Sequence, residues 1–353
     1  TDDARLVIAN AIGAREKGAV IRPRTRCVAA RREDGRWQLV LQSGGKRETA
    51  SARALINAAG PWVSRVIETV VRVQPRTGVR LVKGSHIVVP RLYAHDRAYL
   101  LQNDDGRIVF AIPFATDFTL IGTTELEVPE HAAEAAASSE EILYLCHAAS
   151  AYFRHPVTPS AVRWTFAGVR ALVNDGSKKP SDVSREYRIE IDGGYGDPPL
   201  VSIFGGKLTT YRALAEKVLE RLRHWLVLGS AWTAREPLPG GDMPPGGLDE
   251  LIGGLHEVHP YLSPAHARRL ARTYGTRAWD LLGGAERIDD LGARIFGDFY
   301  AAELDYLRRE EWAASAEDVL WRRTKLGLIA GASEVETLHA ALATAAPTEK
   351  VAG

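Results

Sequence analysis

The chain has 353 residues, of which 45% are hydrophobic and 25% charged, values typical of a soluble globular protein. Because one hydrophobic core rarely grows beyond about 250–300 residues, this length predicts about two domains. Forty-five Lys and Arg balance forty-four Asp and Glu, and the net charge of +1 argues against a general nucleic-acid binder. No apolar run reaches the roughly 18 residues of a membrane-spanning helix, and no signal peptide opens the chain.

Two further counts bear on location and completeness. The two cysteines, Cys27 and Cys146, form no Cys-x-x-Cys pair, which disfavours a disulfide scaffold and favours a reducing, cytoplasmic location. The chain begins at Thr1 and its single methionine is Met243, so we expect it to be a piece of a longer protein.

The first part of the chain alternates between helical and strand patterns. Apolar residues at helical spacing predict a helix over 1–18, and strand patterns follow at 27–30 and 37–41. The run 54–60 is almost wholly apolar, which favours a strand buried on both faces of a mixed sheet. Pro61 then suits the first turn of a helix.

From residue 78 to about 204 the patterns mostly predict strands, which form a largely antiparallel group. The predicted strands are 79–89, 98–102, 107–113, 118–123, 162–170, 187–191 and 200–204. A helix at 140–153, capped by Ser138 or Ser139, interrupts them, and a long amphipathic helix covers 209–228. Beyond a Pro- and Gly-rich linker at 237–241 we predict helices only.

One segment has the composition of a ligand-binding turn. In Phe204-Gly205-Gly206-Lys207-Leu208-Thr209-Thr210-Tyr211 a strand runs through two glycines directly into a helix. Glycines let backbone N–H groups approach a ligand closely, and a helix N-terminus favours negative charge. An ordinary strand–helix turn is an equally good interpretation, and the spacing is not that of a P-loop.

Four other features leave two interpretations open. The junction at 56–62 is a second strand–glycine–helix turn, for which packing is the simpler explanation. Arg170 lies in an apolar strand, where it either pairs with a structural carboxylate or binds an anionic substrate. Arg185 carries the same ambiguity, with solvent exposure as the plainer alternative. His86 lies in the apolar strand Lys83-Gly84-Ser85-His86-Ile87-Val88-Val89, where a hydrogen-bonded core histidine is more common than a catalytic base.

Several motifs, taken in order, point to a known family. They are Ile56-Asn57-Ala58-Ala59-Gly60-Pro61-Trp62, Lys83-Gly84-Ser85-His86-Ile87-Val88-Val89-Pro90, Ile121-Gly122-Thr123-Thr124, Gly168-Val169-Arg170 and the segment 204–211. With 271–275 and 320–325 of the C-terminal part, this set resembles the FAD-dependent (aerobic, respiratory) glycerol-3-phosphate dehydrogenases. The resemblance covers nearly the whole chain, and Ala171 departs from it where the family often has Pro.

The resemblance implies an α/β (α+β) fold of four segments. Residues 1–77 and 199–235 would form part of an FAD-binding domain of the glutathione-reductase-like or D-amino-acid-oxidase-like kind. Residues 78–198 would form a mainly antiparallel substrate-binding domain, and 236–353 an all-helical C-terminal domain. The family's Gly-x-Gly-x-x-Gly motif, which holds the FAD pyrophosphate, does not occur in these residues. We therefore expect it to precede Thr1, and we expect this chain alone to be inactive.

The resemblance also assigns roles to individual residues. Arg170, Lys207 and His86 would be catalytic, with His86 the candidate base, and Arg170, Arg185 and Lys207 would bind substrate. Two groups would contact FAD: Cys27, Val28, Ala58, Ala59, Gly60 and Trp62, mostly on the adenosine side, and Gly205, Gly206, Lys207, Leu208 and Thr209 at the flavin ring. No metal site is expected.

The implied reaction is oxidation of sn-glycerol 3-phosphate to dihydroxyacetone phosphate by hydride transfer to FAD, with electrons passed to quinone. The protein would then attach peripherally to the cytoplasmic face of the cell membrane, and it could form a homodimer. An oxidase that uses oxygen is the alternative within the enzyme class. An inactive fragment or binding module is the alternative outside it.

Overall fold

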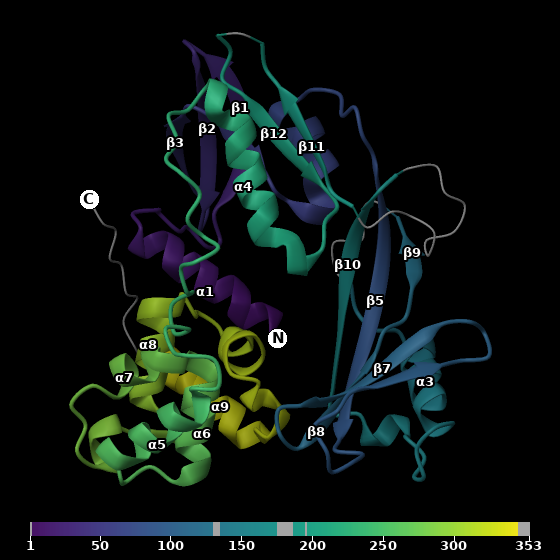
Figure 1. Cartoon of the computed structure of the whole chain (residues 1–353), viewed down its shortest axis with the longest axis vertical. Helices are drawn as coiled ribbons and strands as arrows, with labels where there is room; N and C mark the ends of the chain where they lie inside the picture. The colour runs from purple at the N-terminus through teal and green to yellow at the C-terminus, as the bar shows by residue number, and fades with distance from the viewer. Residues whose placement is uncertain (1, 130–134, 175–185, 195, 345–353) are drawn as a thin grey trace. The chain divides into compact units, whose positions relative to one another are not determined.

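The computed structural model describes residues 2–129, 135–174, 186–194 and 196–344, which form two compact units (Figure 1). The helical unit combines Thr1–Pro23 with Trp232–Gly353, and the sheet unit is Arg24–Ala231. This grouping differs from the expected domain limits, because the first helix, α1 (Asp3–Glu16), belongs with the C-terminal helices. The mixture of helices and sheets with a helical C-terminal part confirms the expected α/β (α+β) class.

A buried ion pair explains why α1 belongs to the helical unit. The helix begins after Asp2, whose side chain accepts hydrogen bonds from the N–H groups of Ala4 and Arg5. The Arg5 guanidinium then donates to both carboxylate oxygens of Glu311, at 2.5 and 2.8 Å, and the Glu311 side chain is fully buried. Losing either partner would leave the other charge buried alone, which is costly.

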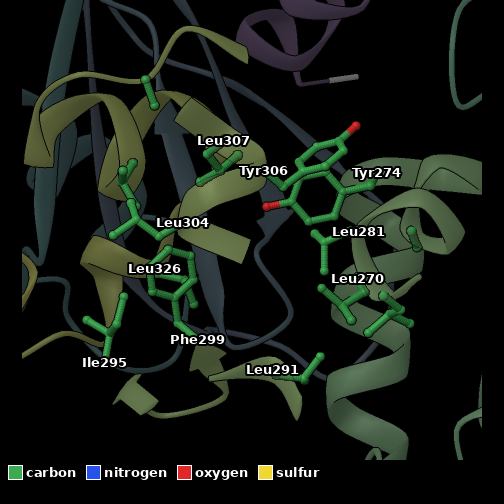
Figure 2. Close-up of a cluster of buried hydrophobic side chains, with 14 of the residues drawn as sticks. Leu270, Tyr274, Leu281, Leu291, Ile295, Phe299, Leu304, Tyr306, Leu307 and Leu326 are labelled. Carbon is green, nitrogen blue, oxygen red and sulfur yellow. The ribbon is translucent and has the colours of Figure 1, made fainter. Parts of the chain in front are cut away.

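The helical unit encloses one hydrophobic core, part of which Figure 2 shows. Its main helices are α5 (Leu248–Val258), α6 (Pro264–Tyr274), α7 (Ala278–Leu282), α8 (Ala301–Glu311) and α9 (Ala332–Thr344). Arg269 of α6 donates to both oxygens of Glu303 of α8, each at 2.7 Å, and the Tyr274 hydroxyl donates to the same carboxylate.

The prediction that this part contains helices only was wrong in one place. Strands β13 (Arg294–Phe296) and β14 (Phe299–Tyr300) form a small antiparallel hairpin. The connection is only two residues long and includes Gly297, whose φ of +50° allows the tight reversal. Strands of two or three residues are too short to show an alternating pattern in the sequence.

The described residues of the sheet unit form three separate sheets. The first is an antiparallel meander of β1 (Arg26–Glu33), β2 (Arg36–Ser43) and β3 (Lys46–Ala52). Its turns, at 34–35 and 44–45, have positive φ at every central residue, as two-residue hairpin loops require. The third strand carries mostly exposed polar side chains, so its sequence shows no hydrophobic alternation.

The second sheet joins parts of the chain that lie far apart in sequence. Its order is β11 (Arg188–Asp192), β12 (Leu200–Phe204) and β4 (Leu55–Asn57), and β12 and β4 are parallel. The sequence predicted a strand at 54–60 buried on both faces, but β4 has three residues and Ile56 is 45% exposed. A glycine turn ends the strand early.

Short helical segments follow both parallel strands. After β4 come a 3₁₀ turn (Gly60–Trp62), α2 (Val63–Arg65) and a π-helical stretch (Val66–Val71). After β12 come a 3₁₀ turn (Leu208–Thr210) and α4 (Tyr211–Arg221).

The third sheet is the largest and is antiparallel throughout. Its order is β10-β5-β8-β7-β6, with β9 also paired to β5. The bounds are β5 (Val79–Pro90), β6 (Tyr99–Gln102), β7 (Ile108–Phe114), β8 (Phe118–Gly122), β9 (Leu126–Val128) and β10 (Trp164–Val173). Helix α3 (Ser139–Ser150) packs its apolar side against one face, where Leu145 and Ala149 meet Ile87 and Ile121 (Figure 1).

A buried carboxylate fastens the beginning of α3 to this sheet. Glu141 is 4% exposed, and its oxygens contact the Lys83 ammonium at 2.8 Å and the hydroxyls of Ser85 and Thr124 at 2.8 and 2.7 Å. Ser138 and Glu141 also form a capping box. Burial by itself would raise the pKa of Glu141, but the hydrogen bonds, led by that from Lys83, lower it to about 2.

We predict that Glu141→Gln destabilises the sheet unit by about 3 kcal/mol near pH 7, because it leaves Lys83 without its buried partner. Since the pKa of Glu141 is lowered on folding, the charged carboxylate contributes stability above its unfolded value near 4.5. This contribution is lost as the pH falls towards 2. Urea unfolding followed at pH 7, 5 and 3 should therefore show the difference between wild type and variant shrinking with acidity. Glu140→Gln, on the same helix turn but exposed, is the control. An equal effect of both substitutions, or a difference independent of pH, would contradict the prediction.

Candidate active site

Two glycine turns lie at the same end of the second sheet, beyond the carboxyl ends of its two parallel strands. Strands β4 and β12 run parallel, with Asn57 opposite Ser202, so both turns follow the carboxyl ends of neighbouring strands. Gly60 has φ +55°, Gly205 +71° and Gly206 +110°, conformations that L-residues rarely adopt. Ligands of open α/β sheets bind outside such strand ends.

Asn57 shapes the first of these turns. Its side chain is buried, and its amide donates to the carbonyl of Val63 at 2.9 Å. Its oxygen accepts the N–H of Ala59 at 3.4 Å, which holds Ala58 and Ala59 in the turn before Gly60. The one polar residue that breaks the apolar run at 54–60 is therefore the residue that ends the strand.

The second turn packs closely against β10. A Cβ atom on Gly205 would lie 2.9 Å from the carbonyl oxygen of Glu186 and 3.3 Å from Val173, so only glycine permits this approach. Lys207, Leu208 and Thr209 follow with exposed side chains, and the Lys207 carbonyl accepts the N–H of Thr210 at 3.1 Å. The predicted flavin-facing residues thus form one continuous turn, which is exposed from Gly206 to Thr209.

Arg170 and His86 lie on one face of the third sheet, opposite the face covered by α3. In the β10–β5 register Arg170 faces Val82 and Phe166 faces His86. Because side chains alternate along a strand, His86, Phe166 and Arg170 project from the same side. The His86 ring stacks on Phe166 with centroids 4.8 Å apart, and its far side meets Gly122, where a Cβ atom would collide with the imidazole at 2.1 Å.

The Arg170 guanidinium pairs with Glu125, which the sequence did not single out. Nη1 of Arg170 lies 3.2 Å from a Glu125 carboxylate oxygen, and the two side chains are 37% and 29% exposed. Both of the alternatives that the sequence left open therefore remain available to this residue. It has a carboxylate partner, and it is exposed enough to meet an anion. The signal that could have identified Glu125 is its place immediately after the motif Ile121-Gly122-Thr123-Thr124.

Cys27, Val28 and Trp62 line a common cavity. It has a volume of about 570 Å³, and its other lining residues are Arg26, Arg65, Val66, Thr69 and Val70. Burial raises the pKa of the Cys27 thiol, so this cysteine is suited to packing rather than to nucleophilic chemistry. The structure thus brings together three residues that were expected to contact FAD, two of them, Cys27 and Val28, on its adenosine side. Arg185 lies outside the described residues.

Comparisons with known proteins identify the class. Residues 1–212 match the family model "FAD dependent oxidoreductase", and residues 231–350 match "C-terminal domain of alpha-glycerophosphate oxidase". The chain therefore belongs to the FAD-dependent oxidoreductases.

Its relatives narrow this class. The chain is 49% identical over 335 residues to a glycerol-3-phosphate dehydrogenase of Pseudomonas aeruginosa, covering 94% of this chain and 65% of the relative. It is 43% identical to a D-erythritol 1-phosphate dehydrogenase of Brucella abortus, covering 92% and 65%. The glycerol-3-phosphate dehydrogenase of Bacillus halodurans, solved with FAD, is similar at a TM-score of 0.79 and 28% identity, covering 97% of this chain and 68% of that one. These matches confirm the expected family, and the chain spans just under two thirds of the length of these curated relatives.

The residues present fit the family's cofactor, FAD. Among the described residues, no heavy atom lies within 4 Å of the Cβ position of Gly60, and Gly206 and Lys207 of the second turn are exposed, so both turns present backbone to a ligand. The cavity beside Cys27 and Val28 combines an aromatic ring with Arg26 and Arg65, a lining suited to an adenosine and its anionic neighbour.

We predict that Arg170→Ala in the full-length protein lowers kcat/KM for a phosphorylated substrate by roughly 30- to 1,000-fold. Losing a charge-assisted contact of this kind costs on the order of 2–4 kcal/mol. Steady-state kinetics and thermal melting should be measured together, with Arg107→Ala, on an exposed hairpin of the same sheet, as control. A variant that melts earlier but retains its specific activity would show that Arg170 only serves the fold.

Proposed function

We propose that the protein oxidises sn-glycerol 3-phosphate to dihydroxyacetone phosphate with FAD as the electron acceptor. The observation that carries the proposal is Arg170, partly exposed on the same sheet face as His86. A cation beside a candidate base suits a phosphorylated alcohol, because one end of the substrate is anionic and the other must lose a proton. The names of the relatives supply the identity of that alcohol.

In this proposal the chain's own residues bind and orient the substrate. Arg170 and Lys207 attract the dianionic substrate, and Arg185 grips its phosphate. His86 accepts the hydroxyl proton, and its stack on Phe166 fixes the plane of the imidazole ring. FAD, when bound, accepts the two electrons released from the alcohol carbon. The turn at Gly205-Gly206 and the helical start after it hold backbone N–H groups and a lysine where negative charge would be stabilised.

Electrons would pass from the flavin to quinone. Within the residues that the structure describes, no helix combines the length and hydropathy that crossing a bilayer would take. We propose peripheral attachment to the inner face of the cell membrane, close to the quinone pool. An oxidase that uses oxygen is the second candidate, supported by the match of residues 231–350 to the C-terminal domain of an alpha-glycerophosphate oxidase.

The direct test is anaerobic reduction of the flavin in the full-length protein. Glycerol 3-phosphate should bleach the oxidised flavin spectrum, whereas its mirror-image isomer and unphosphorylated glycerol should not. Reoxidation by a soluble quinone without peroxide would support the dehydrogenase, and rapid peroxide formation in air would support the oxidase. A flavin that glycerol 3-phosphate leaves oxidised would overturn the proposal.

We expect the 353-residue chain by itself to lack stoichiometric flavin, because these residues contain no glycine motif for the FAD pyrophosphate. Its absorbance spectrum after purification and dialysis, measured beside that of the full-length protein, checks this. A chain that elutes yellow with one flavin per molecule would contradict it.

Lys207 and Arg185 should differ in the kinetic constant that they affect. Lys207→Met should lower mainly kcat, since its charge lies at the turn where the flavin's developing charge would be stabilised. Arg185→Met should raise mainly KM, because a phosphate grip acts equally in the ground state and the transition state. Lys46→Met, at the exposed start of β3, is the control. If Lys207→Met changed KM alone and left stopped-flow flavin reduction at the wild-type rate, the two roles would have to be reassigned.

A further inference from the structure

Two glycines face each other in the longest strand pair of the sheet unit. Gly84 of β5 lies directly opposite Gly168 of β10. By alternation both are on the face that carries His86, Phe166 and Arg170. Side chains are therefore missing at adjacent positions between an aromatic stack and a cation.

The two glycines differ in the space above them. A Cβ atom on Gly84 would lie 2.5 Å from the Thr123 hydroxyl, 3.1 Å from the Thr124 carbonyl and 3.3 Å from Nη2 of Arg170. Glycine is thus required at position 84 for packing, because the chain after β8 and the Arg170 guanidinium lie directly against β5 at this position. Among the residues that the structure describes, in contrast, no heavy atom lies within 4 Å of the Cβ position of Gly168, and Gly168 is exposed.

The surroundings of Gly168 define the chemistry that the open space could accept. Phe166, two residues before it, is held in the stack with His86. Arg170, two residues after it, is kept beside the glycine pair by Glu125. An apolar ring on one side and a cation on the other suit a short carbon chain with an anionic end.

We infer that Gly168 is a specificity-determining position, and that the open space above it receives the carbon chain of a phosphorylated polyol. This rests on the proposed function and adds a limit to it, namely the number of carbons that the site accepts. The relatives named for glycerol 3-phosphate and for D-erythritol 1-phosphate handle three and four carbons, so chain length varies among proteins this similar. A side chain at 168 would occupy the space that the longer polyol needs.

The size of the expected effect follows from the volume of one methyl group. A single methylene in a binding site changes specificity by roughly 10- to 200-fold. Gly168→Ala should therefore raise the KM for glycerol 3-phosphate about 10-fold and leave kcat little changed. Gly168→Val should raise the KM further. The loss of affinity should be larger for D-erythritol 1-phosphate than for glycerol 3-phosphate.

The experiment uses the full-length protein with four glycine variants, Gly168→Ala, Gly168→Val, Gly84→Ala and Gly78→Ala. KM and kcat are measured for glycerol 3-phosphate, and D-erythritol 1-phosphate is measured as substrate or competitive inhibitor. The rise in melting temperature that each ligand produces gives a readout independent of turnover. Gly168→Ala should melt like wild type, as should the control Gly78→Ala, since no described heavy atom lies within 4 Å of the Cβ position of Gly78. Gly84→Ala should instead lower the melting temperature, because its methyl group collides with Thr123.

The outcomes separate this inference from the proposed function. A graded rise in KM from Gly to Ala to Val, with unchanged melting and a greater loss for the longer ligand, supports it. An unchanged KM in well-folded Gly168 variants, an equal loss for both ligands, or a wild type that does not bind the four-carbon ligand overturns it. A wild type whose flavin is not reduced by glycerol 3-phosphate overturns the proposed function itself.

Discussion

The pairing of β5 with β10 is the constraint on which the candidate active site depends. Ten consecutive residues of each strand lie in register from Val79 to Val88, without a bulge. This register places Phe166 beside His86, Gly168 beside Gly84 and Arg170 beside Val82. A slip of either strand by one residue would turn that strand's side chains on this face, His86 of β5 or Phe166 and Arg170 of β10, to the face that α3 covers. The apolar core beneath α3, which includes Ile87 and Val89, makes such a slip costly, so the packing of one face determines the chemistry of the other.

In both units, buried ion pairs hold neighbouring elements together. In the sheet unit Glu141 joins the start of α3 to β5 and to the chain after β8. Its partners in β5, Lys83 and Ser85, are sequence neighbours of Gly84 and His86. In the helical unit Arg269 and Glu303 join α6 to α8, and Arg5 and Glu311 join α1 to the end of α8. Each carboxylate accepts at least two hydrogen bonds, which offsets the cost of removing it from water.

Much of this structure could be predicted from the sequence, and the misses have physical causes. Long strands with apolar runs, such as β5 and β10, and the glycine turn at 204–211 carry strong local patterns. The strand at 54–60 was predicted too long, because its apolar composition hides the turn that Asn57 and Gly60 impose. Strands β3, β13 and β14 are too polar or too short to leave an alternating pattern.

The candidate site could be predicted only in part, since most of its geometry depends on contacts between distant residues. Glu125 meets Arg170 across 45 residues, and Glu141 meets Ser85 across 56. No local pattern contains such distances. The motifs identified Arg170, Lys207 and His86 as candidates, but the neighbours that orient them became visible only in the folded chain.

The helical unit combines the first and last parts of this sequence, and this affects the order in which the unit folds during synthesis. Arg5 and Glu311 are separated by 306 residues. During synthesis, at roughly 5–20 residues per second, about 15–60 s pass between the synthesis of α1 and that of its partner helix α8. The whole sheet unit, which ends at Ala231, emerges within this interval and can fold before it ends, while Arg5 and Ile12 of α1 have no partner helix to bury them. The order of translation therefore makes closure of the helical unit a late step in folding.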